Sequence, residues 1–370
     1  MKQTLQFPFY AKFAFILLIL ILITIIYFYG QSVISPLLLS LLFAILLRPV
    51  SGFLNTKLRI PHTLACVITV LLFVVFFGII LYFISTQLAV MANDWDKIKS
   101  NLAQHYKNIQ LYINDTLNIS KTEQDEMVSK ATSGSMDTGK QLLGTTLISF
   151  SDSMMSLITI PIYTFLILLY RTHFVSFLCQ LVKDKYHATL QDILKTVKTS
   201  VQSYIIGLLF EFVIVSVLTS IGLMILGLKY AILLGVITGL LNLIPYIGIV
   251  IAGVLTVIAS LTGTSDLSII LGILIVNVVV QLIDNNILVP MVVSSKVEIN
   301  SIASIVGIII FGMIAGISGM FLAIPIMAIA KVIFDRVDSL KPWGYLLGDD
   351  LPKNFSWKKG KRLRVVQKPD

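Results

Sequence analysis

The stretch LACVITVLLFVVFFGIILYFISTQLAV, residues 64–90, contains no charged side chain. A helix that crosses a bilayer needs about 20 mainly apolar residues, and a run of about 18 or more already marks a candidate span. A backbone in hydrocarbon must satisfy its own hydrogen bonds, as it does in a helix. Residues 64–90 are therefore predicted to form a transmembrane helix, which makes this a membrane protein.

The rest of the chain has a matching composition. Of 370 residues, 56% are hydrophobic and 13% are charged, whereas a soluble domain carries about 25% charged residues. Working outward from residues 64–90, further apolar runs cover approximately residues 11–29, 33–50, 146–170, 204–226, 230–261, 267–290 and 301–334. We predict an all-α, polytopic membrane helix bundle with about eight transmembrane helices.

Two runs, residues 230–261 and 301–334, are longer than one crossing needs. Each contains a GxxxG motif and a glycine followed by an Ile-Pro pair at the same offset. Proline removes a helical hydrogen bond and glycine lets backbones approach, so these two helices are predicted to be broken or re-entrant around a binding site. Tight packing with a chance similarity is the alternative. The residues predicted to shape the backbone are Gly235, Gly239, Pro245, Gly248, Pro290, Gly312, Gly316, Gly319 and Pro325.

The charges between the runs predict the orientation. Lysine and arginine are concentrated after the second run, after the fourth run and in the C-terminal tail, which places these segments in the cytoplasm by the positive-inside rule. Six or eight crossings both leave the two termini inside. The predicted parts are a membrane region (1–90), an extracytoplasmic amphipathic helical insert (91–145), a membrane region (146–337) containing a transport core (204–335) and a cytoplasmic amphipathic helix (174–200), and a basic tail (338–370).

Two acidic residues, Glu211 and Asp284, lie within the apolar runs. A charge at bilayer depth costs about 2.5–3.5 kcal/mol on insertion scales, so such residues are functional candidates. The alternative role is structural, through hydrogen bonds between helices or pairing with a lysine near a span end. The predicted lining of a solute or ion path consists of Glu211, Asn242, Asn277, Gln281, Asp284 and Asn285.

No catalytic or metal site is predicted. Gly316-Ile-Ser318-Gly319 matches the GxSG pattern of rhomboid-type serine proteases, but that chemistry needs a histidine base in a neighbouring span. The four histidines all fall outside the predicted spans, and no His-Glu-x-x-His motif occurs. We therefore expect neither an enzyme nor a cofactor. The basic tail lacks a groove-reading module, so nucleic acid is not an expected partner.

Three motifs resemble the AI-2E (autoinducer-2 exporter, or PerM-like permease) family of transporters. They are Leu243-Ile-Pro-Tyr-Ile-Gly248, Asp284-Asn-Asn-Ile-Leu-Val-Pro290 and the glycine-rich stretch from Gly307 to Pro325. The resemblance covers nearly the whole chain in span order. It implies a bacterial inner-membrane transport protein of about eight helices and a homo-oligomer. This chain departs from the family pattern at Asp284, often glutamate, and at residues 297–300, where His-Pro or Asn-Pro is common.

The expected function is transport, with export of a small polar solute such as a quorum-sensing signal as the leading hypothesis. A sodium/proton antiporter or a channel is the first alternative, and a non-transporting membrane scaffold is the second. Expected partners are the solute, sodium or protons, the lipid bilayer and further copies of the chain. Glu211 and Asp284 would bear the charge in such a path, and Asn242 and Asn285 would hydrogen-bond a polar solute.

Overall fold

The computed structural model describes residues 8–94, 97, 100, 104, 135–244, 248–260, 267–288 and 299–349. All regular secondary structure in these residues is helical, and six of the helices are long and apolar enough to cross a membrane. The prediction of an all-α membrane bundle is therefore confirmed. Pro245, Pro290, most of the predicted insert 91–145 and the tail beyond residue 349 lie outside the described residues.

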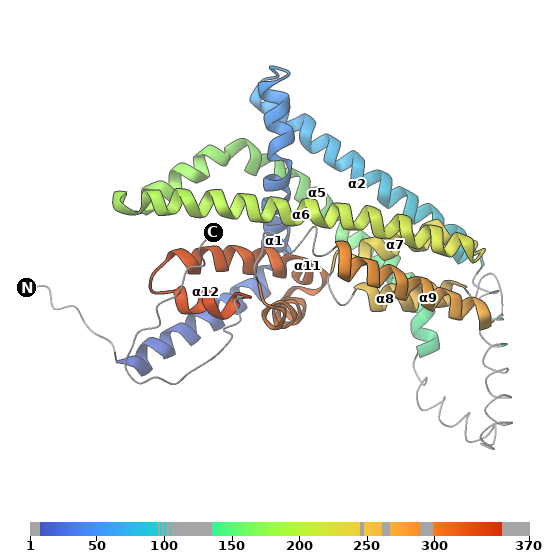
Figure 1. Cartoon of the computed structure of the whole chain (residues 1–370). Helices are drawn as coiled ribbons and strands as arrows, with labels where there is room; N and C mark the ends of the chain where they lie inside the picture. Colours follow the sequence, from blue (N-terminus) through green and yellow to red (C-terminus); the bar gives the residue numbers. More distant parts are fainter. Residues whose placement is uncertain are drawn as a thin grey trace, which may run out of the picture.

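Three long helices pack together on one side of the molecule (Figure 1). They are α1 (Phe9–Thr56), α2 (His62–Ala92) and α5 (Ser135–Leu181). The predicted spans 11–29 and 33–50 are one continuous helix, α1, rather than two. Pro36 lies inside α1, and the helix bends where the sequence suggested a break (Figure 1). A single proline removes one hydrogen bond and bends a helix without ending it.

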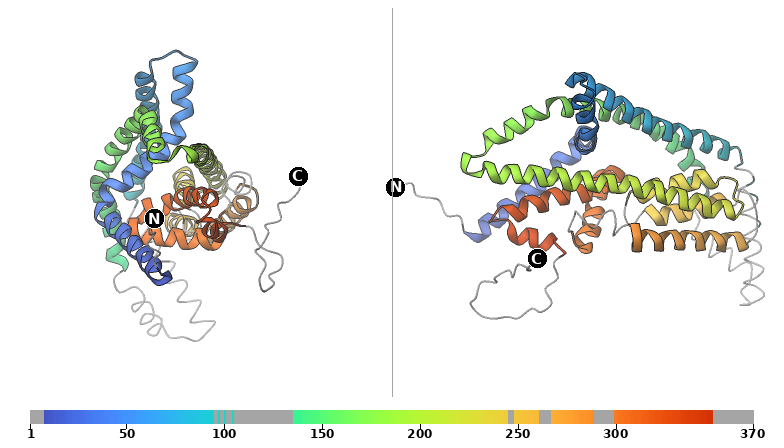
Figure 2. Two further views of the ribbon diagram at one scale, coloured as in Figure 1. Left: turned by 90° about the vertical axis from the view of Figure 1, so that its left-hand side faces the viewer. Right: turned by 45° about the horizontal axis from the view of Figure 1, so that its top comes forward.

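A central helix, α6, organises the remaining elements. It has 39 residues. α7 and α9 pack against its C-terminal half and α8 packs on α7 and α9, while α11 packs against the N-terminal half of α6 and against α1 (Figures 1 and 2). The bounds are α6 (His187–Ile225), α7 (Ala231–Asn242), α8 (Gly248–Ser260), α9 (Leu267–Ile283), α11 (Ser301–Arg336) and α12 (Lys341–Leu347).

The predicted amphipathic helix 174–200 is divided between two helices. Its first part is the end of α5 and its second part is the start of α6, with a short 3-10 turn at Asp184–Tyr186 between them. His187 Nε2 lies 2.9 Å from the carbonyl oxygen of Cys179 and 3.0 Å from that of Val182. The last carbonyl groups of a helix lack partners within it, so the His187 ring stabilises the corner that interrupts the predicted helix.

The two long runs are both broken, as predicted, and each forms a helical hairpin. α7 and α8 lie side by side and are joined by residues 243–247, so they run in opposite directions. α11 turns back at Gly316, where φ is 59° and ψ is −143°, a conformation that side chains disfavour. A Cβ atom on Gly312 would contact Met320, and one on Gly307 would contact Met327. The two arms of α11 therefore pack against each other.

The Gly…Ile-Pro repeat does not mark equivalent positions in the two hairpins. Gly239 lies in the first arm of the α7–α8 hairpin, whereas Gly319 and Pro325 lie in the second arm of α11, beyond the turn at Gly316. Pro325 is buried inside a helix that continues past it. The sequence similarity therefore reflects close packing rather than a structural repeat.

The two hairpins approach α6 from opposite ends. Gly239 packs against Ser216 of α6, and Arg336, at the far end of α11, donates a hydrogen bond to Asp192 near the start of α6. Leu243, just beyond the end of α7, packs against the apolar core that α11 shares with α6 and α1. The inner ends of the two hairpins therefore meet near the middle of α6 (Figure 1).

Candidate functional site

Close packing of α7 on α6 positions the candidate site. Cβ atoms at Gly235 and Gly239 would collide with Ser220 and Ser216 of α6 and with main-chain atoms of that helix. Small residues at this spacing let two helix backbones approach in a membrane. The approach carries Asn242, at the end of α7, to the level of the middle of α6.

Three polar side chains meet at this level. Asn242 Nδ2 donates hydrogen bonds to Glu211 Oε1 at 2.7 Å and to Asp284 Oδ2 at 3.2 Å. Glu211, Asn242 and Asp284 are 5%, 7% and 3% exposed. Sequence reasoning singled out all three, and the structure places them in one cluster. Glu211 lies about 20 Å from the C-terminal end of α6 at about 1.5 Å per residue, which is deep within a span.

A change of helix type places Asp284. α9 ends at Ile283 and continues as a π-helical turn, Asp284–Leu288. Such turns hold an extra residue in the helix and frequently occur at functional sites. Val280 and Leu288, on either side of Asp284, pack against Val215 of α6 in one apolar cluster. These contacts fix the end of α9 against α6 and orient the Asp284 carboxyl towards Asn242.

The cluster continues as a larger set of buried polar groups between α6, α7, α8 and α9. Among the described residues, six buried polar atoms in this region have no hydrogen-bond partner. In native proteins such groups are nearly always paired with protein or water, so each needs an explanation. We call the residues that carry them, together with Asn242, the polar interior: Glu211, Ser216, Thr219, Asn242, Asn277, Gln281 and Asp284.

The polar interior includes the predicted Asn277 and Gln281, but not Asn285. Asn277 lies two turns and Gln281 one turn before Asp284, and Asn277 Nδ2 would lie 3.9 Å from a Cβ atom on Gly253 of α8. Asn285 is exposed. Consecutive helical residues point in directions about 100° apart, so burial of Asp284 turns its neighbour Asn285 away.

Sequence reasoning missed Ser216 and Thr219 of α6. Both are buried, and Thr219 is completely inaccessible. They follow Glu211 by five and eight residues, which places them about 140° and about 80° around α6 from Glu211 at about 100° per residue, so a helical projection does not group them with Glu211. Single hydroxyl residues are common in membrane helices, so neither attracts attention without knowledge of the helices beside α6.

The two carboxyl groups lack a basic partner. Within the described residues, neither Glu211 nor Asp284 forms an ion pair with lysine, arginine or histidine. Both accept hydrogen bonds from the same nitrogen, so their oxygens lie no farther apart than two hydrogen bonds end to end. Two negative charges this close in apolar surroundings repel each other, and burial of a charge requires compensation. The site is therefore suited to hold a proton or a cation.

The protease-like GxSG pattern lies elsewhere. Ser318 follows the turn of α11, and its hydroxyl donates to the carbonyl of Ala315 at 3.0 Å. All histidines were predicted to lie outside the spans, but the helices long and apolar enough to cross a membrane include His62, His173 and His187. Ser318 is thus engaged with its own helix.

Comparison with known proteins gives a consistent result over nearly the whole chain. The family described as "AI-2E family transporter" matches residues 15–339. The chain is 26% identical over 344 residues to "Putative transport protein YueF" of Bacillus subtilis, covering 86% of this chain and 90% of that protein. It is 25% identical over 309 residues to "Putative transport protein YrrI" of the same organism, covering 82% and 86%.

Proposed function

Because the chain belongs to the AI-2E family of transporters, we propose that it carries a small polar solute across the bacterial inner membrane through the polar interior. One observation carries this proposal: Asn242, at the end of a broken helix, bridges the carboxyl group of Glu211, near the middle of α6, and that of Asp284, at the end of α9. Purely structural packing in lipid needs no such group, and ionisable residues at this depth are typical of solute and ion pathways.

The residues of the polar interior have distinct proposed roles. Glu211 and Asp284 hold the charge of the site and exchange a proton or sodium ion as the solute passes. Asn242 keeps the two carboxyl groups together and offers its amide to the solute. Asn277 and Gln281 extend hydrogen-bonding capacity along α9, where Nδ2 and Oε1 have no partner among the described residues. Ser216 and Thr219 do the same on α6.

The broken helices support transport because they supply backbone groups as well as side chains. α7 ends at Asn242 beside the cluster, and the last carbonyl groups of a helix have no partner within it. Interrupted helices near the middle of a membrane form the binding sites of many transporters. The inner end of the α7–α8 hairpin therefore combines carboxylate, amide and backbone ligands for one small solute.

Direction and topology are further parts of the proposal. The lysine-rich corner between α5 and α6 supports a cytoplasmic position for that corner. As to direction, we propose that the chain exports a polar signal of the quorum-sensing type. The long exposed apolar surfaces of α1 and α2 are suited to lipid and to contacts between copies of the chain in a homo-oligomer.

The direct test is flux through purified protein in proteoliposomes. Vesicles are loaded with autoinducer-2 or with labelled small polar solutes, with and without a sodium or proton gradient. We expect release from vesicles with the unmodified protein and almost none with Glu211→Gln or Asp284→Asn. Asn285→Ala is the matched control, because this neighbour of Asp284 is exposed, and it should transport normally.

Each alternative predicts a different outcome. A channel would release solute at a rate that does not saturate and would not need a gradient of a second ion. An antiporter would exchange sodium for protons without any organic solute. A scaffold would show no flux of any kind, and a cysteine beside Asp284 would resist water-soluble thiol reagents from both sides. Full activity of Asp284→Asn would contradict the proposed site.

A further inference from the structure

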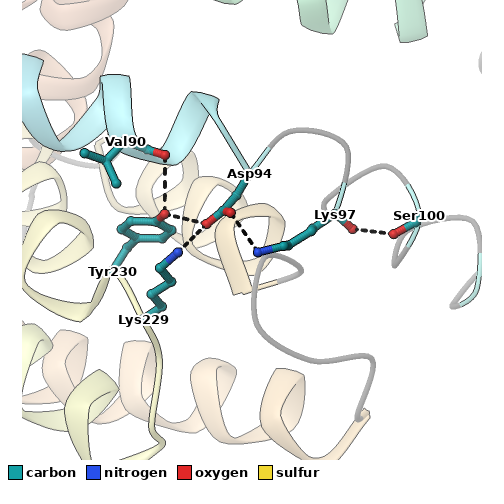
Figure 3. A network of polar contacts seen from close by, with 6 residues as sticks. All are labelled: Val90, Asp94, Lys97, Ser100, Lys229 and Tyr230. Carbon is teal, nitrogen blue, oxygen red and sulfur yellow. Dashed lines mark hydrogen bonds and ion pairs between the residues drawn. The ribbon is translucent and has the colours of Figure 1, made fainter.

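A second polar cluster lies at the other end of the α7–α8 hairpin (Figure 3). Asp94, just beyond the end of α2, accepts hydrogen bonds from Lys229 Nζ at 2.6 Å, from Tyr230 Oη at 2.6 Å and from Lys97 Nζ at 3.1 Å. The Tyr230 hydroxyl also lies 3.5 Å from the Val90 carbonyl oxygen. Hydrogen bonds between charged groups are among the strongest in proteins.

The cluster joins two parts of the fold that otherwise have few contacts. α2 packs mainly against α1 and α5, and it contacts the α6–α9 unit through α7. Lys229 and Tyr230 lie in the corner between α6 and α7, next to Gly227, whose φ is 75°. This corner is the root of the hairpin that carries Asn242 at its inner end. A displacement of the corner relative to α2 would therefore move the hairpin.

The bonds of the cluster are open to competition from water. The Asp94 side chain is 11% exposed, but those of Lys97 and Lys229 are 67% and 52% exposed. Ion pairs with an exposed lysine gain little net free energy, because water solvates the ammonium group almost as well. The pKa of Asp94 lies well below its usual range, chiefly because Lys229 donates to it, so the carboxylate stays charged near neutral pH. The hydrogen bonds of Asp94 are thus formed in this structure, but water can replace them at a small cost in free energy.

The cluster also borders one end of the polar interior. The Tyr230 ring, 5% exposed, packs in the apolar core with Leu223 of α6, and Met91 of α2 covers the same core. Leu223 is one helical turn beyond Thr219, the residue of the polar interior on α6 nearest this end. Apolar side chains over about one helical turn therefore lie between Thr219 and the corner whose Tyr230 and Lys229 bind Asp94.

We propose that the bonds of Asp94 with Lys229 and Tyr230 form a latch that keeps this end of the polar interior closed, and that opening the latch admits water as far as Thr219. The inference rests on one part of the proposed function, namely that water can enter the polar interior. It does not require that a solute is carried. Its test can therefore fail or succeed independently of the flux measurements.

The test measures how fast a buried cysteine reacts with a water-soluble methanethiosulfonate reagent. Thr219→Cys is placed in the full-length protein, with the native Cys66 and Cys179 replaced, and the latch is broken by Asp94→Asn or by Lys229→Gln. We expect each substitution to raise the reaction rate about tenfold or more, as for loss of one hydrogen bond to a charged group. The double variant should react no faster than Asp94→Asn alone, because the bond from Lys229 is one of those that Asp94→Asn already disrupts.

Two matched controls separate a latch from general loosening. Thr164 of α5 is as completely buried as Thr219, so Thr164→Cys should react at the same low rate in every background. Asp338→Asn breaks another aspartate–lysine pair, 2.6 Å from Lys341, and should leave Thr219→Cys protected. Equal reaction of both cysteines, no acceleration at Thr219 in either latch variant, or additive effects in the double variant would overturn the latch.

Discussion

The two helical hairpins use the same central helix in different ways. The α7–α8 hairpin packs on the C-terminal half of α6 and brings an amide to two carboxyl groups. The α11 hairpin packs on the N-terminal half of α6 through Val201, Ile205 and Leu208 and buries an almost entirely apolar surface. One hairpin therefore contributes a polar group to the proposed site, and the other contributes an apolar surface against which Leu243 packs.

The difference teaches how a membrane bundle can hold charge at depth. The inner end of the α7–α8 hairpin is polar, but Leu243 next to it packs into the apolar core of α11. The α11 hairpin reverses direction at Gly316, where the backbone has a positive φ. Substitutions of the polar residues that meet at the inner end of the first hairpin should thus affect activity before stability, and substitutions in the second hairpin should affect stability first.

The strongest test of this comparison is Asp284→Asn. The amide keeps the shape of the side chain but removes its charge, so the pair with Glu211 no longer requires a proton or cation. Loss of an interaction with a charged group is worth about 1.5–3 kcal/mol, so transport should fall roughly 10- to 150-fold. Flux in proteoliposomes measures the loss, and an unchanged melting temperature shows that the fold persists. A large fall in stability instead would favour a structural role.

Gly239→Val should show that the position of Asn242 depends on the close packing of α7 against α6. A Cβ atom at Gly239 would collide with Ser216 and the Phe212 carbonyl oxygen, so α7 must move away from α6 and carry Asn242 with it. Overpacking of this kind costs about 1–3 kcal/mol, and transport should fall together with the melting temperature. Gly253→Ala in α8 is the control, since its nearest neighbour would be Asn277 Nδ2 at 3.9 Å. It should change neither quantity.

Gly316→Ala should affect only the second hairpin. A side chain at a φ of 59° strains the backbone by about 1–3 kcal/mol. We expect a lower melting temperature but residual transport in the protein that remains folded. Gly52→Ala in α1 should be neutral or slightly stabilising, because nothing lies within 4 Å of the added atom. If Gly316→Ala abolished transport without loss of stability, the assignment of distinct roles to the hairpins would fail.

The smallest expected effect is on the pH dependence of stability at Asp94. Hydrogen bonds from Lys229, Tyr230 and Lys97 lower the pKa of Asp94, and the same carboxylate raises the pKa of Lys229. The Asp94 contribution is therefore complete above the ordinary aspartate pKa of about 3.9 and is lost as the pH falls through the lowered value. The Lys229 contribution is complete below about 10.4 and is lost as the pH rises through the raised value.

Melting curves of the unmodified protein and Asp94→Asn test this dependence. The difference between their melting temperatures should stay constant from about pH 5 to pH 9 and shrink below about pH 4 and above about pH 10. Asp338→Asn, which removes an exposed pair, should show a smaller difference throughout. A difference at Asp94 that grew on acidification would contradict the assigned hydrogen bonds.

The sequence was informative where a residue is out of place in lipid. Glu211, Asn242 and Asp284 could be selected because polar side chains in apolar runs are rare and costly. Their convergence could not be deduced, because it depends on the close approach of α7 to α6 and on the π-helical turn at Asp284. Neither the depth of that contact nor a local change of helix type has a distinct signature in an apolar sequence.

The sequence predicted which segments form helices better than it predicted where those helices begin, end or turn. The residues between 11–29 and 33–50 resemble a connection, yet they continue α1, since neither Gly30 nor Pro36 alone ends a long helix. In residues 301–334, Pro325 was the conspicuous breaker, but the turn occurs at Gly316. A proline can be accommodated in a helix by a bend, whereas a reversal of direction needs a backbone conformation that glycine adopts readily.

The length of α6 links the site to the lipid around it. A helix of 39 residues is about 58 Å long at about 1.5 Å per residue, whereas the hydrocarbon layer is about 30 Å thick. α6 must therefore slant steeply or extend beyond the acyl chains, and its slant depends on membrane thickness. Since both hairpins rest on this one helix, shorter or longer acyl chains should alter how their inner ends meet near the middle of α6, and with it the contact between Asn242 and Glu211.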